Sequence, residues 1–335
     1  MITKALLLFL LGFILLIKGG DWFVDGASGI AKRFKIPEII IGATVVSIGT
    51  TIPEVMVSAS AAFQGSSATA YGNAIGSVIC NSALICGITI TFKPSIVDKK
   101  PLILPVIFFF SAAIFYSIIA YAGVGFTRIV GVILLLLFVA YVTLSLLSVK
   151  KTPAVIEAPE EKEENETTSK RSKIDQFKSS VCYEVFALVI GAVCIAFGAN
   201  FLVDNCEILA RAMGVPESVI ALTLVALGTS LPELITAITS LLKGHGNLSL
   251  GNVIGANLFN LVLVSGLAIT ISPFSVPTEK LFMGYNASLA IDIPVMLTVM
   301  GVLTIPTLIK GKTSRIQGIV LLLICAAYYV FQFAI

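Results

Sequence analysis

The sequence predicts an all-α polytopic membrane protein in which ten transmembrane helices form two inverted repeats of five helices each. Three observations predict this fold class: the composition, the number of long apolar runs, and an internal repeat. Of the 335 residues, 57% are hydrophobic and 12% are charged, whereas soluble proteins carry about 25% charged residues. The composition therefore excludes a soluble globular protein, and the formal net charge of +3 gives no indication of a nucleic-acid partner.

A helix that spans the hydrocarbon core of a membrane needs about 20 mostly apolar residues. Ten segments of the chain meet this requirement, and the first lacks a small-residue cleavage site, so we expect it to be a retained helix. The ten predicted helices are 5–31, 38–63, 70–92, 101–121, 125–149, 180–210, 217–242, 248–270, 283–309 and 314–334.

The chain divides into two halves, 1–149 and 180–335, joined by the polar segment 150–179. This segment carries an acidic stretch followed by a basic one and too few apolar residues to form a core, which predicts a linker. Most of the 22 Lys and Arg residues lie in loops on the same side as this linker. Since basic residues accumulate in cytoplasmic loops, we expect a cell-membrane protein with a cytoplasmic linker and with both termini outside.

Residues 18–87 align without a gap on residues 197–266. The matches fall on polar and turn-forming residues, which chance similarity between two apolar helices does not produce. Because each half has an odd number of helices, the second copy enters the membrane from the opposite side. Inverted repeats of this kind are characteristic of secondary transporters, whose binding sites lie near mid-membrane between the repeats. The clearest matches are Asp25 with Asp204, Gly49-Thr50 with Gly228-Thr229, Pro53-Glu54 with Pro232-Glu233, Gly72-Asn73 with Gly251-Asn252, and Asn81 with Asn260.

The first matched motif places a carboxylate, Glu54 or Glu233, near the middle of a predicted helix in each half. A charged residue at this depth is costly and marks an ion pathway or a proton relay. The proline before each glutamate frees a backbone carbonyl one turn earlier. Hydroxyl oxygens accompany the two acids, and the whole set consists of hard oxygen donors that suit Ca2+ or Na+. The hydroxyls belong to Thr50, Thr51, Thr229 and Ser230.

The second matched motif runs from Gly72 to Asn81 in the first half and from Gly251 to Asn260 in the second. Ser77 and Asn81 lie four residues apart and therefore share one helix face. The glycines have the spacing of a helix-packing face, and pure packing remains an alternative to a functional role. For Asn81 and Asn260 we favour a role as ion ligands, whereas for Asn73 and Asn252 we favour interhelical hydrogen bonds.

These motifs resemble the alpha repeats of the Na+/Ca2+ exchangers in the cation/Ca2+ antiporter superfamily, close to the short prokaryotic members. The resemblance covers essentially the whole chain, with the alpha repeats at 41–87 and 220–266, and implies the Na+/Ca2+ exchanger fold. It also implies that the first and sixth helices slide across a core of four helices for alternating access. The ligands that it implies are Thr50, Glu54, Ser77, Asn81, Thr229 and Glu233, with backbone carbonyls near Ser47 and Ala226.

Two positions depart from the pattern of the family. Some relatives carry aspartate where this chain has Asn260, and serine where it has Ala256. In the K+-dependent branch an acid at the Asn260 position is associated with K+ binding, so its absence argues against K+ co-transport. The H+/Ca2+ exchangers have a different first motif.

The expected function is therefore alternating-access exchange of Na+ for Ca2+. The chain is not expected to be an enzyme, because no nucleophile with a base and no phosphate loop occurs, and no prosthetic group is expected. The expected partners are the two ions and the lipid bilayer. The matched acids arise within one chain, which is compatible with a monomer and favours a carrier over a channel. Exchange is expected to be electrogenic and K+-independent; H+/Ca2+ exchange, K+-dependent exchange and a passive cation channel remain alternatives.

Overall fold

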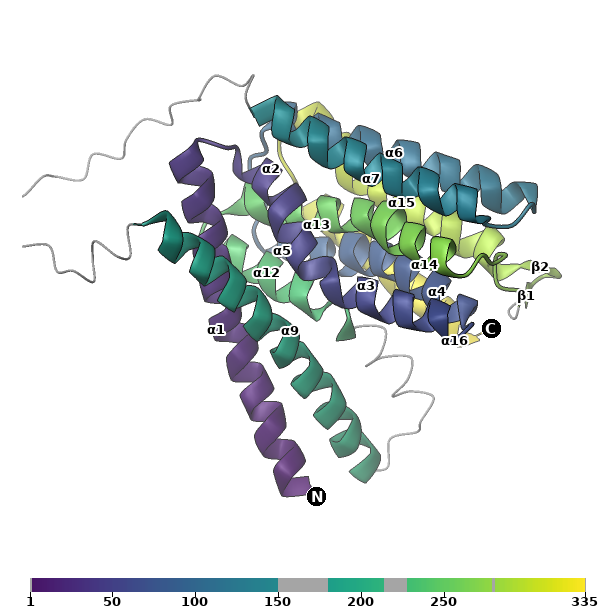
Figure 1. Cartoon of the computed structure of the whole chain (residues 1–335), viewed down its shortest axis with the longest axis horizontal. Coiled ribbons are helices and arrows are strands. Elements are labelled where there is room, and N and C mark those ends of the chain that lie inside the picture. Colours follow the sequence, from purple (N-terminus) through teal and green to yellow (C-terminus); the bar gives the residue numbers. More distant parts are fainter. Residues whose placement is uncertain (1, 150–179, 214–227, 279–280, 335) are drawn as a thin grey trace, which may run out of the picture.

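The computed structural model describes residues 2–149, 180–213, 228–278 and 281–334 (Figure 1). Nine helices in these residues are long and apolar enough to cross a membrane. A tenth apolar helix, α12, is described over Leu231–Leu242. Its predicted start at residue 217 lies outside the described residues, as does the predicted linker 150–179. The described part of the chain thus agrees with the prediction of ten helices.

The first half contains five long helices, two of which are interrupted by a π-helical turn (η). Residues 38–63 form one helix made of α2, η1 and α3, and residues 67–92 form another made of α4, η2 and α5. The elements are α1 (Ile2–Phe34), α2 (Glu38–Ile41), η1 (Gly42–Val46), α3 (Ser47–Phe63), α4 (Ser67–Ile79), η2 (Cys80–Ile85), α5 (Cys86–Phe92), α6 (Lys99–Ala122) and α7 (Arg128–Val149).

The described part of the second half follows the same order of helices, with a β-hairpin and η5 added before α15. Its elements are α9 (Val181–Ala212), α12, α13 (Gly246–Phe259), η4 (Asn260–Val264), α14 (Ser265–Ile271), β1 (Leu281–Phe282), β2 (Tyr285–Asn286), η5 (Ser288–Asp292), α15 (Ile293–Lys310) and α16 (Arg315–Ala334).

A short β-hairpin corrects one predicted boundary. Strands β1 and β2 pair antiparallel, where a helix was predicted to begin at residue 283. The turn residues Met283 and Gly284 have φ values of 50° and 83°, which are typical of tight hairpin turns and incompatible with an α-helix. The helix instead begins at Ser288 with η5.

Contacts exchanged between the halves reveal the two-fold relation that the repeat predicts. A Cβ at Gly131 of α7 would lie 2.8 Å from the Thr270 nitrogen and 2.9 Å from the Gly266 carbonyl oxygen. A Cβ at Gly318 of α16 would lie 2.7 Å from the nitrogen of Thr91 and 2.9 Å from the carbonyl oxygen of Gly87, the residues matched to Thr270 and Gly266 in the repeat. The last helix of each half therefore packs closely on the opposite half in the same way.

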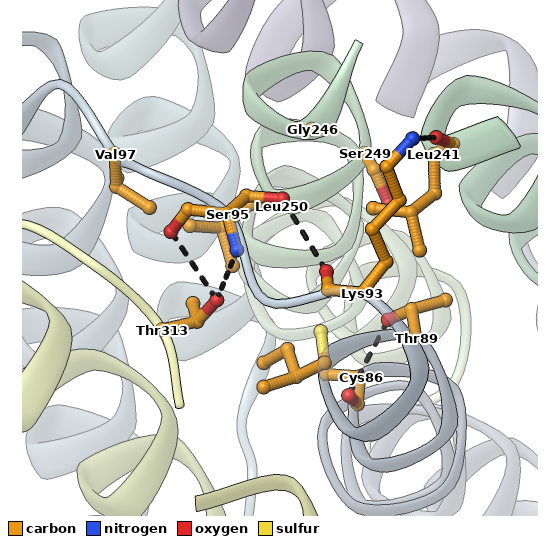
Figure 2. A pocket seen from close by; sticks show the side chains of 11 residues that line it. Cys86, Thr89, Lys93, Ser95, Val97, Leu241, Gly246, Ser249, Leu250 and Thr313 are labelled. Carbon is orange, nitrogen blue, oxygen red and sulfur yellow. Dashed lines mark hydrogen bonds between the residues drawn. The ribbon is translucent and has the colours of Figure 1, made fainter. Parts of the chain in front are cut away.

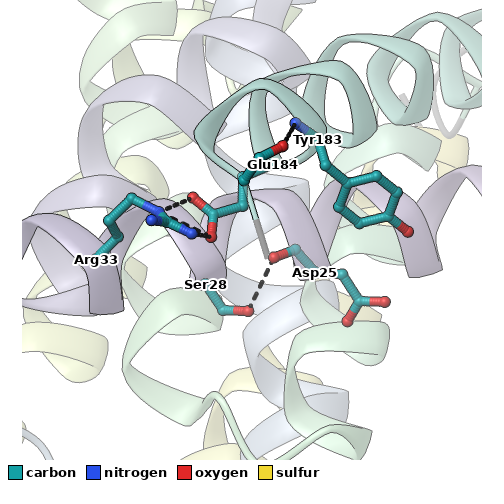
Figure 3. A network of polar contacts seen from close by, with 6 residues as sticks. Asp25, Ser28, Arg33, Tyr183 and Glu184 are labelled. Atoms are coloured by element: carbon teal, nitrogen blue, oxygen red, sulfur yellow. Dashed lines mark hydrogen bonds and ion pairs between the residues drawn. The ribbon is translucent and has the colours of Figure 1, made fainter. Parts of the chain in front are cut away.

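The long helices α1 and α9 pack against each other along their length and cross beside the other helices (Figure 1). Small residues allow this close approach: a Cβ at Gly12 would lie 2.8 Å from the carbonyl oxygen of Gly198. Arg33 near the end of α1 donates from Nε and Nη2 to the carboxylate of Glu184 on α9, at 2.9 to 3.1 Å (Figure 3). We call α1 and α9 together the long-helix pair.

Helix α13 crosses the segment formed by α2 and η1 at very short range in the centre of the protein. A Cβ at Gly255 would lie 2.6 Å from the Cα of Ala43, and one at Gly251 would lie 3.0 Å from the Cα of Ile39. The glycines of the second motif are therefore packing residues in this half. Because they have no side chain, α13 of the second half can approach α2 and η1 of the first half closely.

Candidate cation site

The predicted ligands of the first half lie on two adjoining helices. Ser47, Thr50, Thr51 and Glu54 belong to α3, which continues through Pro53 without interruption. Ser77 lies on α4, and Asn81 is the second residue of η2. All of these residues are buried, as expected for a site inside the core.

The predicted ligands of the second half lie at the start of α12 and of η4. Ser230 is the N-cap residue of α12, Thr229 precedes it, and Glu233 lies in the first turn. Asn260 is the first residue of η4. Ala226 lies outside the described residues, so its predicted carbonyl ligand stays a prediction.

The carboxylates of Glu54 and Glu233 are the central feature of the site. Both side chains are fully buried, and none of their four oxygens has a hydrogen-bond partner among the described residues. They lie close enough for the charge of Glu233 to act on Glu54. Buried carboxylates that repel each other and lack hydrogen bonds require a positive charge, which a cation or protons must supply.

Neutral oxygens surround the two acids. In the described part of the chain, the hydroxyls of Thr51 and Ser230 and the side-chain amides of Asn81 and Asn260 are buried without hydrogen-bond partners. Leaving such groups unpaired costs about 1–3 kcal/mol each. Since unpaired polar groups are concentrated at the matched positions of the two motifs, we infer that these groups serve a ligand.

Contacts between the halves bring these residues together. The segment η4, which begins with Asn260, contacts α3, and η2, which contains Asn81, contacts α12. The Thr50 side chain lies beside the Glu233 carboxylate. The asparagine of each half therefore lies on an element that packs against the helix carrying the glutamate of the other half.

Ser47 uses its side chain for packing. Its Oγ donates to the Gly42 carbonyl oxygen at 2.7 Å and lies 2.9 Å from the carbonyl oxygen of Asn252. The hydroxyl therefore already joins these two helices, and the predicted contribution of Ser47 through its backbone carbonyl stays a prediction.

Asn73 and Asn252 form the interhelical hydrogen bonds that the sequence favours, and these bonds involve predicted ligands. Thr229 Oγ1 donates to Asn73 Oδ1 at 3.3 Å, and Thr50 Oγ1 donates to Asn252 Oδ1 at 3.2 Å. The repeat identified all four residues but gave no sign that the partners come from opposite halves.

Two further buried hydroxyls were not predicted. Thr236 and Ser240 lie three and seven residues after Glu233, on the same face of α12, and neither hydroxyl has a hydrogen-bond partner among the described residues. Their matched positions in the first half are Val57 and Ala61. Because these residues are apolar, a comparison of the two repeats does not identify Thr236 and Ser240 as candidate site residues.

Two small cavities adjoin these helices. One lies where Lys93 Nζ donates to the Leu241 carbonyl oxygen at 2.8 Å, and its lining contains no carboxylate, so it is a poor cation site (Figure 2). The other is lined by Phe23 of α1, by three residues of α9, and by Thr50, Pro53 and Pro232. Residues of both long helices therefore line this cavity together with the predicted ligand Thr50.

The site as a whole is suited to hard cations. It combines two carboxylates with hydroxyl, amide and carbonyl oxygens, the donors that Ca2+ prefers. No cluster of three or more His, Cys, Asp or Glu side chains occurs in the described ranges, so neutral oxygens must supply the remaining ligands.

Comparisons with known proteins agree with this chemistry. Residues 4–147 and 183–334 match the family described as sodium/calcium exchanger protein. The chain is 31% identical to the sodium/calcium exchanger MaX1 of Methanosarcina acetivorans, with 100% of both chains covered. It is 32% identical to the putative antiporter CaxA of Alkalimonas amylolytica, over 98% of this chain and 99% of that one.

Solved structures of the sodium–calcium exchanger NCX_Mj have the same fold. One, soaked with Na+ and Ca2+, superposes with a TM-score of 0.76 and 31% identity, covering 100% of this chain and 99% of that chain. The predicted fold class and the resemblance are thereby confirmed, and the protein is a multi-pass membrane transporter rather than an enzyme. The chain belongs to the sodium/calcium exchanger protein family.

Proposed function

We propose that this protein is an electrogenic, K+-independent antiporter that exchanges Na+ for Ca2+ by alternating access. The observation that carries the proposal is that Glu54 and Glu233, one from each half, are fully buried and that their carboxylates have no hydrogen-bond partner among the described residues. The relatives named as sodium/calcium exchangers support the choice of ions.

The charge of the site supports competition between the two ions. Two carboxylates supply a charge of −2, which one Ca2+ or two Na+ neutralise. The neutral oxygens of Ser77, Asn81 and Asn260 offer places for a further Na+ without adding charge. A site that holds one Ca2+ in one half-cycle and three Na+ in the other carries different charges, so net charge crosses the membrane.

The ligands that we propose combine both halves. Glu54 and Glu233 bind either ion, assisted by the side chains of Thr50, Thr51, Ser77, Asn81, Thr229, Ser230 and Asn260 and by the carbonyls of Ser47 and Ala226. Asn260 offers an amide oxygen without a charge, which supports K+ independence. The basic loops support a cytoplasmic linker and outward-facing termini.

The experiment is uptake of radioactive Ca2+ into proteoliposomes that contain the full chain. An outward Na+ gradient should drive uptake, an inside-positive potential should accelerate it, and K+ on either side should leave it unchanged. Glu54→Gln and Glu233→Gln should abolish it. Uptake that ignores Na+ and follows a pH gradient would instead identify an H+/Ca2+ exchanger.

A counterflow measurement separates a carrier from a passive channel. In a carrier, unlabelled Ca2+ inside the vesicles accelerates entry of labelled Ca2+, because loaded sites return faster across the membrane. In a channel, internal Ca2+ gives no acceleration.

A further inference from the structure

Two asparagines of the second motif each accept a hydrogen bond from a proposed threonine ligand of the opposite half. Thr50 of the first half donates to Asn252 of the second at 3.2 Å, and Thr229 of the second donates to Asn73 of the first at 3.3 Å. The same two motif positions form both pairs. The arrangement therefore follows the two-fold relation of the whole protein and is not an accident of local packing.

The chemistry of a hydroxyl gives these bonds a consequence. A threonine hydroxyl has one proton and two lone pairs, and only the lone pairs can face a cation. The proton must be directed elsewhere, or it points at the cation and opposes binding.

The other acceptors near the Thr50 hydroxyl are themselves proposed ligands. The Ser47 carbonyl oxygen lies 3.4 Å away, and the Glu233 carboxylate lies beside the same side chain. A proton donated to either one would occupy a lone pair that the cation needs. Asn252 is an acceptor outside the proposed ligand set.

We propose that Asn73 and Asn252 are positioning residues that accept hydrogen bonds from the hydroxyls of Thr229 and Thr50. The lone pairs of these hydroxyls and of the neighbouring ligands then remain available to the transported cation. This inference rests on the proposed function. The two asparagines act through the threonines and need no contact with the ion.

The two asparagines are held differently. Asn73 Nδ2 donates to the Ser58 hydroxyl at 2.9 Å and to the Glu54 carbonyl oxygen at 3.2 Å, which fixes the orientation of its amide. The residue matched to Ser58 is Ala237, and Asn252 Nδ2 has no partner among the described residues. Asn252 is instead oriented by the Thr50 hydroxyl, whose Oγ1 lies 3.2 Å from its Oδ1.

The test is a double-mutant cycle on the full chain in proteoliposomes. Asn252→Ala should raise the half-saturating Ca2+ and Na+ concentrations about tenfold, the effect of one lost hydrogen bond. The maximal transport rate should change by a smaller factor than these concentrations. In a Thr50→Val background, which has no hydroxyl proton to direct, Asn252→Ala should raise them by less than about twofold further. Asn73→Ala with Thr229→Val should behave in the same way.

Asn257→Ala is the matched control. Asn257 is a fully buried asparagine of the same helix, α13, and its Nδ2 donates to the Ser82 hydroxyl at 2.7 Å. It does not bond to a proposed ligand. Its loss should lower the melting temperature as much as Asn252→Ala does, while the half-saturating concentrations of both ions stay unchanged.

Three outcomes overturn the inference. Additive effects of Asn252→Ala and Thr50→Val would show that the asparagine acts independently of the threonine. Unchanged half-saturating concentrations in a folded Asn252→Ala protein would remove its role, and an equal change in Asn257→Ala would make the effect purely structural. Failure of the proposed function is distinct, because the wild-type protein would then show no Na+-driven Ca2+ uptake.

Discussion

At the scale of single residues, the energetics of the protein centre on Glu54 and Glu233. Two buried carboxylates without hydrogen bonds destabilise the fold unless a positive charge neutralises them. Ion binding and folding are therefore linked: a cation that binds the folded protein stabilises it in proportion to the logarithm of its concentration.

We expect Ca2+ to raise the melting temperature of the purified protein. Glu54→Gln and Glu233→Gln should melt at or above the temperature of the ion-free wild type, because each removes a buried charge, and neither should respond to Ca2+. A thermal melt with and without Ca2+ measures this. A Ca2+-dependent rise in Glu54→Gln as large as that of the wild type would remove this glutamate from the site.

A second residue-scale prediction concerns the unpaired Nδ2 of Asn252. Ala237→Ser should supply the acceptor that Ser58 supplies to Asn73, and should raise the free energy of unfolding by about 1 kcal/mol. The mirrored substitution Ser58→Ala should lower it by a similar amount, because it leaves Asn73 with one acceptor fewer. Denaturant or thermal unfolding of the two variants provides the measurement, and changes of the opposite sign would contradict the assigned hydrogen bonds.

The sequence identified those candidate site residues that recur at matched positions of the two halves. Glu54, Glu233, Asn81 and Asn260 stood out because acids and amides recur at matched positions in otherwise apolar helices. Thr236 and Ser240 escaped detection because Val57 and Ala61 occupy their places in the first half. Hydrogen bonds between the halves depend on how the two copies pack, which no spacing along the chain reveals.

At the scale of elements, glycines determine how closely helices approach. A Cβ at Gly191 would lie 2.7 Å from the Cα of Phe23, so α9 cannot carry a side chain there without moving away from α1. At Gly301 of α15 the nearest atom is the flexible Cδ1 of Ile305, at 3.7 Å. A glycine is therefore required for close packing at position 191, whereas position 301 has room for a side chain.

Gly191→Ala is therefore expected to separate the long-helix pair and to reduce both the melting temperature and transport. Gly301→Ala should leave transport unchanged and should raise the free energy of unfolding by up to about 1 kcal/mol, because alanine favours helix. Thermal melts and Ca2+ uptake of the two variants test the comparison. Equal tolerance of both substitutions would contradict the close packing of α1 on α9.

Element boundaries illustrate the limits of hydrophobic periodicity. Apolar runs identified the membrane helices, yet they could not show that η2 and η4 are π-helical or that a hairpin precedes α15. A π-turn differs from an α-turn by a single inserted residue, and in helices that are apolar on most faces this shift cannot be read from the sequence. The asparagines at these turns were found through the repeat alone.

At the scale of the whole molecule, the long-helix pair is attached unequally to the two halves. Lys243, at the end of α12, forms ion pairs of 2.8 Å with Asp25 and 3.3 Å with Asp21 of α1. Gly20 of α1 packs on Ile235 of α12. The residue matched to Ile235 is Met56 of α3, and it is 66% exposed. The pair therefore covers Ile235 in the second half and leaves the matched Met56 exposed.

Lys243→Met should weaken this attachment. Exposed ion pairs contribute about 0–1 kcal/mol. The population of the opposite access state, in which α1 no longer covers α12, should therefore rise by up to about fivefold. Labelling of Thr236→Cys from the linker side, in a chain without its native cysteines, measures the change. Unaltered labelling in Lys243→Met would show that the ion pairs do not hold this state.

The repeat supplies a mirrored variant. Gln64 matches Lys243, and Asp204 matches Asp25. The mirrored pair therefore has its acid, Asp204 of the second half, but a neutral residue of the first half in place of the base. Gln64→Lys should stabilise the opposite access state by pairing with Asp204, and should increase linker-side labelling of Thr236→Cys as Lys243→Met does. Reduced labelling would contradict the symmetry of the two states.

Because Lys243 has no basic counterpart in the first half, the exchanger is expected to rest in one orientation more than in the other. A protein built from two similar halves would otherwise rest equally in either orientation and run equally well both ways. With Lys243 on one side and neutral Gln64 on the other, the two reorientation steps face unequal barriers. Ion flux through the exchanger should then rectify, so that equal and opposite gradients drive unequal currents.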